Sequence, residues 1–441
     1  MESTSEFLRA RGDAGEPVRV GLVGAGQMGT GIAAQARLVP GLELRAVADI
    51  DIDKATAACA ALNGAAPVVS EEPDVLREAY EDRRQVITRD ARLLTELDLD
   101  VLVEATGVPR VATEVAFSAA IARRDLITMT VEADVTIGRL LRILFERSGA
   151  IYTLAAGDEP SAAWELVDFA RTMGLDVVAA GKGKNNPLRH KAVASELVAE
   201  ARRKQMNPKM LTAFVDGSKT MCEMALLANA TGLAIDTPGM HGASVDRAEL
   251  ADRMRPAADG GILSAPGRVE YVQGDLAPGV FVTVRCEDPT VSRDLAYLGI
   301  GSGPYWSLVR PYHLANLEVP ITIARLVRDR RATLLSRFHT AEVVACAKTD
   351  LTAGTAVTGI GGDEVHGFTV SADDAEEHSY VPLGLLERAR IVRPVAAGTI
   401  LSHDDVELDE DQLIVRAWRL QKSLDVLGEG RRDLLSLAAV A

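Results

Sequence analysis

Short apolar runs alternate with amphipathic stretches rich in Ala and Leu over the first third of the chain. Residues 18–23 predict a buried strand, and residues 32–39, which follow a glycine-rich turn, predict a helix. Such alternation is typical of a doubly wound parallel sheet of the Rossmann type, so we expect an α/β fold of this class. Further strands are predicted at 42–48, 85–88, 97–104, 126–132 and 151–155, and further helices at 51–62, 111–123 and 137–147.

The pattern changes twice after residue 155. From Gly157 the predicted helices are longer, as at 160–173 and 207–230, and 263–284 is typical of β structure, which together predict an α+β domain with substrate loops. From about residue 340 short apolar strands are broken by glycine, and two similar units predict a small all-β module. The predicted division is a polar arm (1–17), a nucleotide-binding domain (18–155), a central catalytic domain (156–338), and a C-terminal module with a tail (339–441).

The glycine turn after the first predicted strand has the spacing G-x-G-x-x-G. Gly24 and Gly26 would let the backbone approach a pyrophosphate, and Gly29 would let the helix pack closely on the strand. The second strand ends at Asp49, twenty residues after Gly29, where a carboxylate reaches the ribose hydroxyls of a dinucleotide. A glycine turn without a ligand is the alternative. The expected cofactor-binding residues are Gly24, Gly26, Gln27, Met28, Gly29 and Asp49, with Ala105, Thr106, Gly107 and Glu132 in turns after later strands.

The composition narrows the class of partner. The chain has 441 residues, 47% of them hydrophobic, and a formal net charge of −15, which argues against nucleic acid and anionic membranes as partners. Its four cysteines are far apart and form no C-x-x-C pair, which indicates a reduced compartment. The N-terminus shows no signal peptide, and no apolar run reaches the ~20 residues that span a bilayer. We therefore expect a cytoplasmic protein that acts on a small-molecule substrate.

Two carboxylates follow the last predicted strand of the nucleotide-binding domain. Asp158 and Glu159 precede Pro160 at a helix start, where acidic side chains favourably oppose the helix dipole, so a helix cap is one interpretation. Adjacent carboxylates at the carboxyl end of a strand also predict a site for a hard divalent cation such as Mg²⁺ or Mn²⁺. The sequence leaves both interpretations open.

A loop with an excess of hydrogen-bond donors follows the apolar run 177–180. It carries Lys182, Lys184, Asn185 and Asn186 between glycines and a proline. The lysines are candidates to bind phosphate or to polarise a carbonyl beside the nicotinamide. A solvated basic turn would explain the lysines alone, but it explains the asparagine pair less well. We therefore favour a functional loop.

The last long helix predicted in the central domain has an apolar face and a polar face. Asp216, Lys219 and Glu223 fall at i, i+3 and i+7, so they are predicted to share a face toward a cleft, or toward solvent as a salt-bridge stripe. Two loops carry His241 and His313, which are candidate acids or bases because histidine titrates near neutrality. An inert loop histidine is the alternative for each. Lys219, Glu223 and His241 join the lysine loop as catalytic candidates.

Several of these segments carry a family resemblance that covers nearly all of residues 18–410. The segments AGKGKNNPL at 180–188, FVDGSKTMCEMALLANATGL at 214–233 and PGMHG at 238–242 resemble the 1-deoxy-D-xylulose 5-phosphate reductoisomerase-like oxidoreductases. The nucleotide-binding domain is similar to that of homoserine dehydrogenases. The ending AGTIL…DDVEL at 397–408 resembles the SAF (β-clip) module.

The resemblance implies an NAD(P)-dependent reaction in two stages. A retro-aldol and aldol rearrangement moves the carbon skeleton, and hydride then reduces the resulting aldehyde. Members of the family form homodimers through the central domain, so we expect a homodimer or a higher homo-oligomer. The resemblance assigns substrate binding and polarisation to Lys182, Lys184, Asn185 and Asn186, and a metal or acid–base role to Asp158, Glu159 and Glu223.

The cofactor expectation departs from an NADPH-dependent reductoisomerase. Asp49 would repel the 2′-phosphate of NADP, and no arginine follows it to offset the repulsion, so NAD(H) is favoured over NADP(H). Other activities stay open at this point. They are homoserine-type oxidation, oxidative isomerisation of branched sugar acids, a lyase or dehydratase reaction, and binding of NAD by a sensor without turnover.

Overall fold

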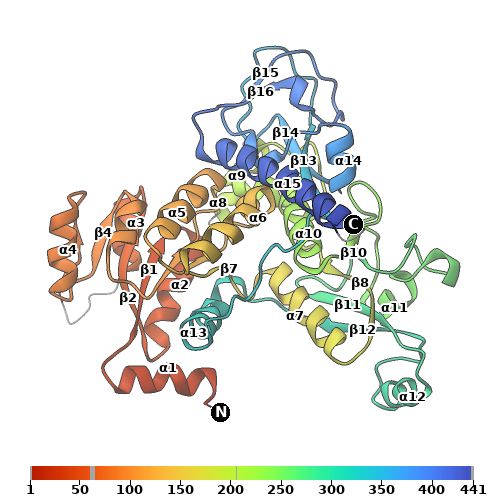
Figure 1. Cartoon of the computed structure of the whole chain (residues 1–441), viewed down its shortest axis with the longest axis horizontal. Helices are drawn as coiled ribbons and strands as arrows, with labels where there is room; N and C mark the ends of the chain where they lie inside the picture. Colours follow the sequence, from red (N-terminus) through yellow and green to blue (C-terminus); the bar gives the residue numbers. More distant parts are fainter. Residues whose placement is uncertain (1, 60–64, 205, 439–441) are drawn as a thin grey trace.

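The computed structural model describes residues 2–59, 65–204 and 206–438, which form three units (Figure 1). The nucleotide-binding unit lies at one end of the molecule and the central unit at the other. The C-terminal module lies above the junction of the two in the view of Figure 1. The expected α/β class is confirmed, because a parallel sheet with apolar clusters on both faces is joined to a separate mixed sheet.

The nucleotide-binding unit is built on a seven-stranded sheet whose described strand pairs are all parallel. The order β3-β4-β2-β1-β5-β6-β7 places β1 between β2 and β5, so the glycine turn after β1 lies where the strand order reverses. Open α/β sheets bind ligands at this point. The strands are β1 (Val18–Val23), β2 (Leu42–Ala48), β3 (Val68–Val69), β4 (Val86–Thr88), β5 (Val101–Glu104), β6 (Leu126–Thr128) and β7 (Tyr152–Leu154). The helices are α2 (Gln27–Leu38), α3 (Ile52–Ala58), α4 (Pro73–Glu81), α5 (Pro109–Ile121) and α6 (Val131–Ser148).

Two segments of this unit differ from the sequence prediction. Residues predicted as a loose arm form α1 (Thr4–Asp13), which is held by a capping box between Ser3 and Glu6 and by the buried Leu8. One buried leucine gives too little apolar periodicity to predict this helix. Glu132, predicted in a turn after a strand, lies instead in the first turn of α6, where its charge favourably opposes the helix dipole.

A helix from later in the chain also packs on the nucleotide-binding unit. In α13 (Val319–Asp329), Val319, Ile323 and Leu326 are buried in the same apolar cluster as Leu22 of β1. Its polar residues face away from this cluster, which gives the helix a strongly amphipathic pattern. This helix, which the sequence places in the central domain (156–338), therefore lies against the nucleotide-binding unit.

The central unit contains a five-stranded mixed sheet in the order β12-β11-β8-β10-β9. Helices α7 and α10 cover one face, where Ala180, Val269 and Val282 of the sheet contribute to the largest apolar cluster. The strands are β8 (Asp176–Gly183), β9 (Ala234–Ile235), β10 (Arg268–Val272), β11 (Val280–Arg285) and β12 (Tyr305–Arg310). The helices are α7 (Glu159–Thr172), α8 (Ala194–Arg203), α9 (Pro208–Val215), α10 (Ser218–Thr231), α11 (Leu250–Arg253) and α12 (Pro289–Tyr297).

The long helix predicted over 207–230 is in fact two helices. The chain turns at Gly217, whose φ of 94° lies in the left-handed region that favours glycine, so α9 ends before Asp216 and α10 begins at Ser218. Asp216 therefore does not share a helix with Lys219 and Glu223. The prediction of one polar face for these three residues is wrong for Asp216.

The C-terminal module is attached to α10 by direct hydrogen bonds. The backbone N–H of Gly367 in β14 donates to Ser218 Oγ at 2.7 Å, and Thr369 Oγ1 donates to the Met221 carbonyl at 3.1 Å. Two small antiparallel sheets form the module, as predicted. Its elements are β13 (Ala341–Ala347), β14 (Val365–Ser371), α14 (Ala372–Glu377), β15 (Arg390–Ile391) and β16 (Val406–Glu407).

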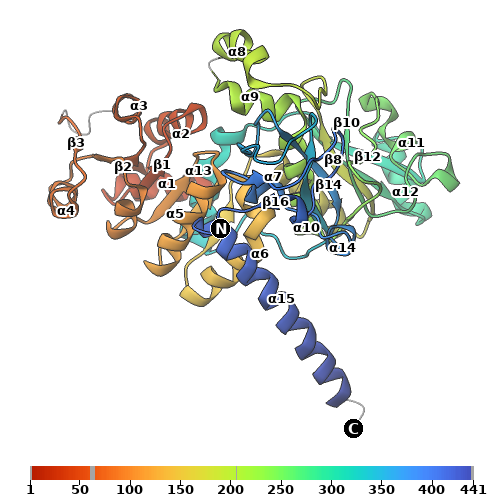
Figure 2. The same cartoon turned by 90° about the horizontal axis from the view of Figure 1, so that it is seen from above.

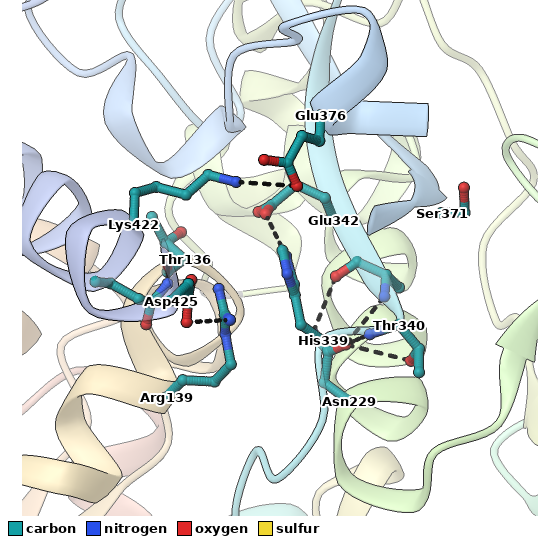
Figure 3. Close-up of polar contacts among 12 residues, drawn as sticks. Thr136, Arg139, Asn229, His339, Thr340, Glu342, Ser371, Glu376, Lys422 and Asp425 are labelled. Atoms are coloured by element: carbon teal, nitrogen blue, oxygen red, sulfur yellow. Dashed lines mark hydrogen bonds and ion pairs between the residues drawn. The ribbon is translucent and has the colours of Figure 1, made fainter. Parts of the chain in front are cut away.

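The last described element is the long helix α15 (Leu413–Ala438), which runs out from the body of the protein (Figure 2). Its first half lies between α6 and the module, as Figure 3 shows, with Arg139 paired to Asp425 at 2.8 Å and Lys422 near Glu376 at 4.0 Å. No helix in the described part of the chain is both long and apolar enough to span a membrane.

Candidate functional site

The glycine turn has the geometry of a dinucleotide-binding turn. A Cβ at Gly24 would come within 2.9 Å of the Ala105 backbone, and a Cβ at Gly29 would lie 1.8 Å from the Gly24 carbonyl oxygen. Only glycine permits this approach between the turn, the start of α2 and the loop after β5. Asp49 completes the arrangement, because its Oδ2 accepts from the Ala25 N–H at 2.6 Å. The structure thus brings the predicted cofactor residues of β1, β2 and β5 together.

Glu104, a buried carboxylate that is not among the predicted site residues, holds the turns at the carboxyl ends of β5 and β6. Glu104, at the end of β5, is completely buried, and its Oε1 accepts from the Thr106 N–H at 2.7 Å and from Thr130 Oγ1 at 3.0 Å. Its Oε2 accepts from Thr128 Oγ1 at 2.7 Å. One carboxylate therefore fixes the turns after β5 and β6. The signal in the sequence is an acidic residue at the end of an apolar strand, followed by the turn Ala105-Thr106-Gly107.

Lys182 lies at the centre of a buried group of charges in the central unit. Its Nζ donates to Glu159 Oε1 at 2.7 Å and also to Glu223 Oε2, and the three side chains are at most 9% exposed. Burial would lower the pKa of Lys182, but the two carboxylates outweigh it and raise the pKa above its usual range. Burial and the charge of Glu159 raise the pKa of Glu223. An ammonium held by two carboxylates is thus fixed in position.

Lys184 has the opposite electrostatic environment. Its side chain is buried, and its Nζ donates to the Phe214 carbonyl at 2.8 Å, with no carboxylate in contact. Burial and the neighbouring charge of Lys182 lower the pKa of Lys184 to about 8. The two lysines of the predicted loop therefore have very different pKa values, although only one residue separates Lys182 on β8 from Lys184 just after its end.

Lys219 connects the central unit to the nucleotide-binding unit. Its Nζ lies 3.0 Å from Glu132 Oε1, and both side chains are almost completely buried. Burial opposes the charged form, but Glu132 and Asp158 raise the pKa of Lys219. Glu132 therefore lies between the buried lysines and the carboxyl edge of the parallel sheet, where the cofactor is expected to bind.

The predicted metal ligands do lie together, with one addition. Ligand atoms of Asp158, Glu159 and His313 all lie within 4.8 Å of one another. However, Glu159 Oε1 already accepts from Lys182, and His313 Nε2 lies 3.3 Å from the same oxygen. Burial and the charge of Glu159 raise the pKa of Asp158 well above its usual range, which favours a neutral carboxyl there. Glu159 is thus engaged by an ammonium as arranged here, and the metal role of Asp158 and Glu159 stays a prediction.

Three other predicted residues lie apart from this charge group. Asn185 is exposed and Asn186 is half-buried in the loop after β8. His241 Nδ1 lies 2.7 Å from Glu270 Oε1. Glu270 pairs with Gly181 in the sheet register, whereas the next residue of β10 pairs with Lys182. Because neighbouring residues of a strand point to opposite faces, His241 and Lys182 belong to opposite faces of the sheet.

A cavity of about 220 Å³ adjoins Glu132 and the turn after β5. Its wall includes Ala213, the neighbour of the Phe214 carbonyl that binds Lys184. A larger cavity of about 670 Å³ lies at the opposite, amino-terminal edge of the parallel sheet. Five of its six arginines are engaged in ion pairs, such as Arg19 with Asp100 at 2.8 Å, and it holds none of the predicted residues. The smaller cavity is therefore the candidate substrate site.

A comparison with protein families bears on this site. Residues 157–319 match the family model described as oxidoreductase DRL, catalytic domain. The match begins one residue before Asp158 and contains Lys182 and Lys184 together with Lys219, Glu223 and His313. With the dinucleotide-type turn, it supports an NAD(P)-dependent oxidoreductase, the enzyme class expected from the sequence. The matched residues end before the C-terminal module, so its SAF resemblance stays a prediction.

Solved structures show distant resemblances. A probable dehydrogenase from Thermotoga maritima is 12% identical over 71% of this chain and 90% of its own, with a TM-score of 0.40. A putative myo-inositol dehydrogenase from Sinorhizobium meliloti is 13% identical over 71% of this chain and 87% of its own, with a TM-score of 0.37. The 1-deoxy-D-xylulose 5-phosphate reductoisomerase of Zymomonas mobilis is 16% identical over 46% of this chain and 58% of its own, with a TM-score of 0.31. Among curated proteins, no sequence matches the chain.

Proposed function

We propose that the protein is an NAD-dependent oxidoreductase that transfers hydride between nicotinamide and the hydroxyl-bearing carbon of a small polyhydroxy compound. The observation that carries the proposal is the glycine turn capped by Asp49, and the buried amine of Lys184, whose Nζ donates to the Phe214 carbonyl, supplies the candidate base. A general base works best when its pKa lies near the working pH. The test is a screen of small polyols, hydroxy acids and their carbonyl forms that follows nicotinamide absorbance. A screen without any absorbance change would overturn the proposal.

Each buried group has a role in this reaction. In the oxidation direction, neutral Lys184 accepts the hydroxyl proton while hydride leaves the same carbon for the nicotinamide. Lys182 stays charged between Glu159 and Glu223, which accept two of its three N–H donors, and the third is assigned to the alkoxide that develops as the proton leaves. Lys219 keeps the carboxylate of Glu132 in place at the cofactor edge.

The proposal does not include the carbon-skeleton rearrangement that the resemblance implied, because hydride transfer alone accounts for the base and the nucleotide turn. A homodimer through the central unit remains our inference from that resemblance. A cytoplasmic location also remains our inference, which the wide spacing of the four cysteines favours.

Lys184 should set the pH dependence of the reaction. For oxidation, kcat/KM is expected to rise with pH and to level off above about pH 8, because only the neutral amine accepts a proton. For the reverse reduction the ammonium is the active form, so the rate should fall above the same pH. Measuring kcat/KM for oxidation and for reduction between pH 6 and 10 tests whether the two change with pH in these opposite directions.

A variant of Lys184 and a matched variant of the exposed Lys191 test whether Lys184 is the base. Lys184→Gln is expected to remove the titration and to lower kcat of oxidation about 10²–10⁴-fold, which is the usual contribution of a positioned base. Lys191→Gln changes an exposed lysine of the following loop and should leave the profile unaltered. An unchanged titration in Lys184→Gln would show that another group is the base.

Asp49 is expected to make the protein prefer NAD(H). Its carboxylate caps the glycine turn, and the residues that follow include Asp51 and Asp53 but no arginine. Asp49→Asn keeps an oxygen for the Ala25 N–H and removes the charge, so NADPH should bind about tenfold tighter, a change of ~1.4 kcal/mol. Fluorescence titration of NADH and NADPH against both proteins measures the preference. Tighter binding of NADPH than of NADH by the unmodified protein would contradict it.

A further inference from the structure

The position of one backbone carbonyl orients the amine of Lys184. Its Nζ donates to the Phe214 carbonyl oxygen at 2.8 Å, which is its one hydrogen bond to the described residues. When the amine is neutral, one N–H stays on this carbonyl, and the second N–H and the lone pair point elsewhere. A base must meet the proton that it accepts at hydrogen-bond distance. The place of the Phe214 carbonyl therefore decides where Lys184 can accept a proton.

A lysine of the C-terminal module holds the turn that follows Phe214. Asp216 lies in this turn, and its Oδ1 accepts from the Ser218 N–H at 2.8 Å. Its Oδ2 lies 2.8 Å from Lys348 Nζ, and both side chains are 0% exposed. A buried ion pair of this kind resists rearrangement, because separating the charges leaves each of them buried without a partner. Lys348, the residue after β13, thereby fixes the end of α9.

The same lysine also holds the loop that begins at Lys184. Lys348 Nζ donates to the Ala192 carbonyl at 2.8 Å and to the Gly362 carbonyl at 2.6 Å. Ala192 belongs to the loop between β8 and α8, whose first residue is Lys184, and Gly362 belongs to the module. One buried ammonium therefore joins the loop that carries the candidate base to the segment that carries its hydrogen-bond acceptor.

Two further contacts join the module to this loop. The Ala194 N–H donates to Asp363 Oδ1 of the module at 3.0 Å. The ring of His190 stacks on that of His366 in β14 with the centroids 4.5 Å apart, and His190 Nδ1 lies 3.0 Å from the Asp216 carbonyl oxygen. Burial and the neighbouring His190 lower the pKa of His366 to about 4, so this buried ring is neutral near pH 7. The module thus holds the loop along its length.

We propose that the C-terminal module is part of the reaction machinery, and that Lys348 is a positioning residue which fixes the Phe214 carbonyl and, through it, the amine of Lys184. This inference rests on the function proposed above and adds a role for the module that hydride transfer alone does not require. Lys348 acts through Asp216 on one side and through the Ala192 carbonyl on the other.

Loss of Lys348 has an electrostatic effect of known sign on the candidate base. Besides burial, Lys182 on β8 lowers the pKa of the amine, whereas Glu223 on α10 and Asp216 raise it. Without Lys348 the charge of Asp216 is unpaired, so it favours the ammonium form of the base more strongly. A loosened loop also hydrates the amine, and hydration acts in the same direction. The pKa of Lys184 should therefore rise.

The test follows the titration of Lys184 by NMR, in protein labelled with carbon-13 at the Cε of lysine and without substrate. The signal that disappears in Lys184→Gln is that of Lys184. Lys348→Met should move its midpoint up by about one pH unit. Thr369→Val is the matched control, because it removes another contact of the module, the hydrogen bond to the Met221 carbonyl, and should leave the midpoint unchanged. The same midpoint in both variants would overturn the role of Lys348.

A second variant keeps the test decisive if Lys348→Met does not fold. Asp216→Asn preserves the shape of the side chain and an oxygen for the Ser218 N–H, but it leaves Lys348 as an unpaired cation. The midpoint of Lys184 should then move down, by about 0.5–1 pH unit, because a like charge disfavours the ammonium. An unchanged midpoint in Asp216→Asn would equally overturn the inference.

Kinetics separate this inference from the proposed function. With a substrate from the screen, Lys348→Met should lower kcat about tenfold or more and move the pH profile of kcat/KM with the NMR midpoint, while the Kd of NADH stays unchanged. Thr369→Val should retain kcat. The expected NMR shifts without turnover in any of the proteins would support positioning by the module and refute the oxidoreductase. A pH profile that Lys348→Met leaves unaltered would overturn the inference, and the oxidoreductase would stand.

Discussion

Lys182→Met is expected to abolish most of the activity and to destabilise the protein. The substitution leaves Glu159 and Glu223 buried side by side without the ammonium that neutralises them. Breaking a buried ion pair in this way costs about 3–5 kcal/mol of unfolding free energy. Loss of a preorganised charge at the reacting centre should lower kcat by about 10²–10³-fold in the protein that remains folded. Denaturant unfolding and steady-state kinetics below the unfolding transition measure the two effects separately.

A second substitution distinguishes the two roles of Lys182. In Lys182→Met combined with Glu223→Gln, only one buried carboxylate lacks a partner, so part of the stability should return. Activity should stay low, because the positive charge is still missing. Lys191→Met, at an exposed position of the following loop, should change stability by less than about 0.5 kcal/mol. Recovery of activity together with stability would show that Lys182 serves only the fold.

Lys348→Met is expected to weaken the attachment of the C-terminal module by a comparable amount. Lys348 Nζ lies 2.8 Å from Asp216 Oδ2, and both side chains are 0% exposed. Lys348 also donates to the Ala192 carbonyl at 2.8 Å and to the Gly362 carbonyl at 2.6 Å. Removing the lysine alone leaves Asp216 charged and buried, so the free energy of unfolding should fall by about 3–5 kcal/mol.

A double-mutant cycle isolates this ion pair. Asp216→Asn and Lys348→Met should each destabilise the protein, and the double variant should lose clearly less than the sum of the two. Lys204→Met is the surface comparison, because Lys204, the residue after α8, pairs with Glu200 of that helix at 39% and 33% exposure, and the substitution should cost less than about 0.5 kcal/mol. Additive losses in the cycle would mean that Asp216 and Lys348 do not stabilise each other.

The parts of the fold and site that the sequence predicted are those with a local signal. The glycine turn, Asp49 and the alternation around them are set by spacing along a short segment, and the structure places them together. The lysine loop was selected because its donors are unusual in an acidic chain, and Lys182 and Lys184 are indeed buried. Glu223 was placed on the correct helix by its apolar neighbours.

The remaining features depend on contacts between distant segments. Asp216 looked like part of a helical stripe, and only the left-handed turn at Gly217 and a lysine from the C-terminal module explain its burial. Glu104 binds residues of two later turns, which no periodicity within β5 reveals. His241 and Lys182 lie on opposite faces of a sheet whose strand order could not be derived from the sequence.

The buried pair of Asp216 and Lys348 also affects how such a chain can diversify. Recombination between two related genes with a crossover near residue 340 would join the module of one protein to the central unit of another. Asp216 and residue 348 of the hybrid would then come from different proteins. If the incoming module had no lysine at position 348, the buried carboxylate of Asp216 would have no partner. Selection would remove such a hybrid, because it would not fold stably. Descendants with an altered cavity should therefore arise by point substitution in the loops that line it around Thr358 and Glu387, rather than by exchange of whole modules.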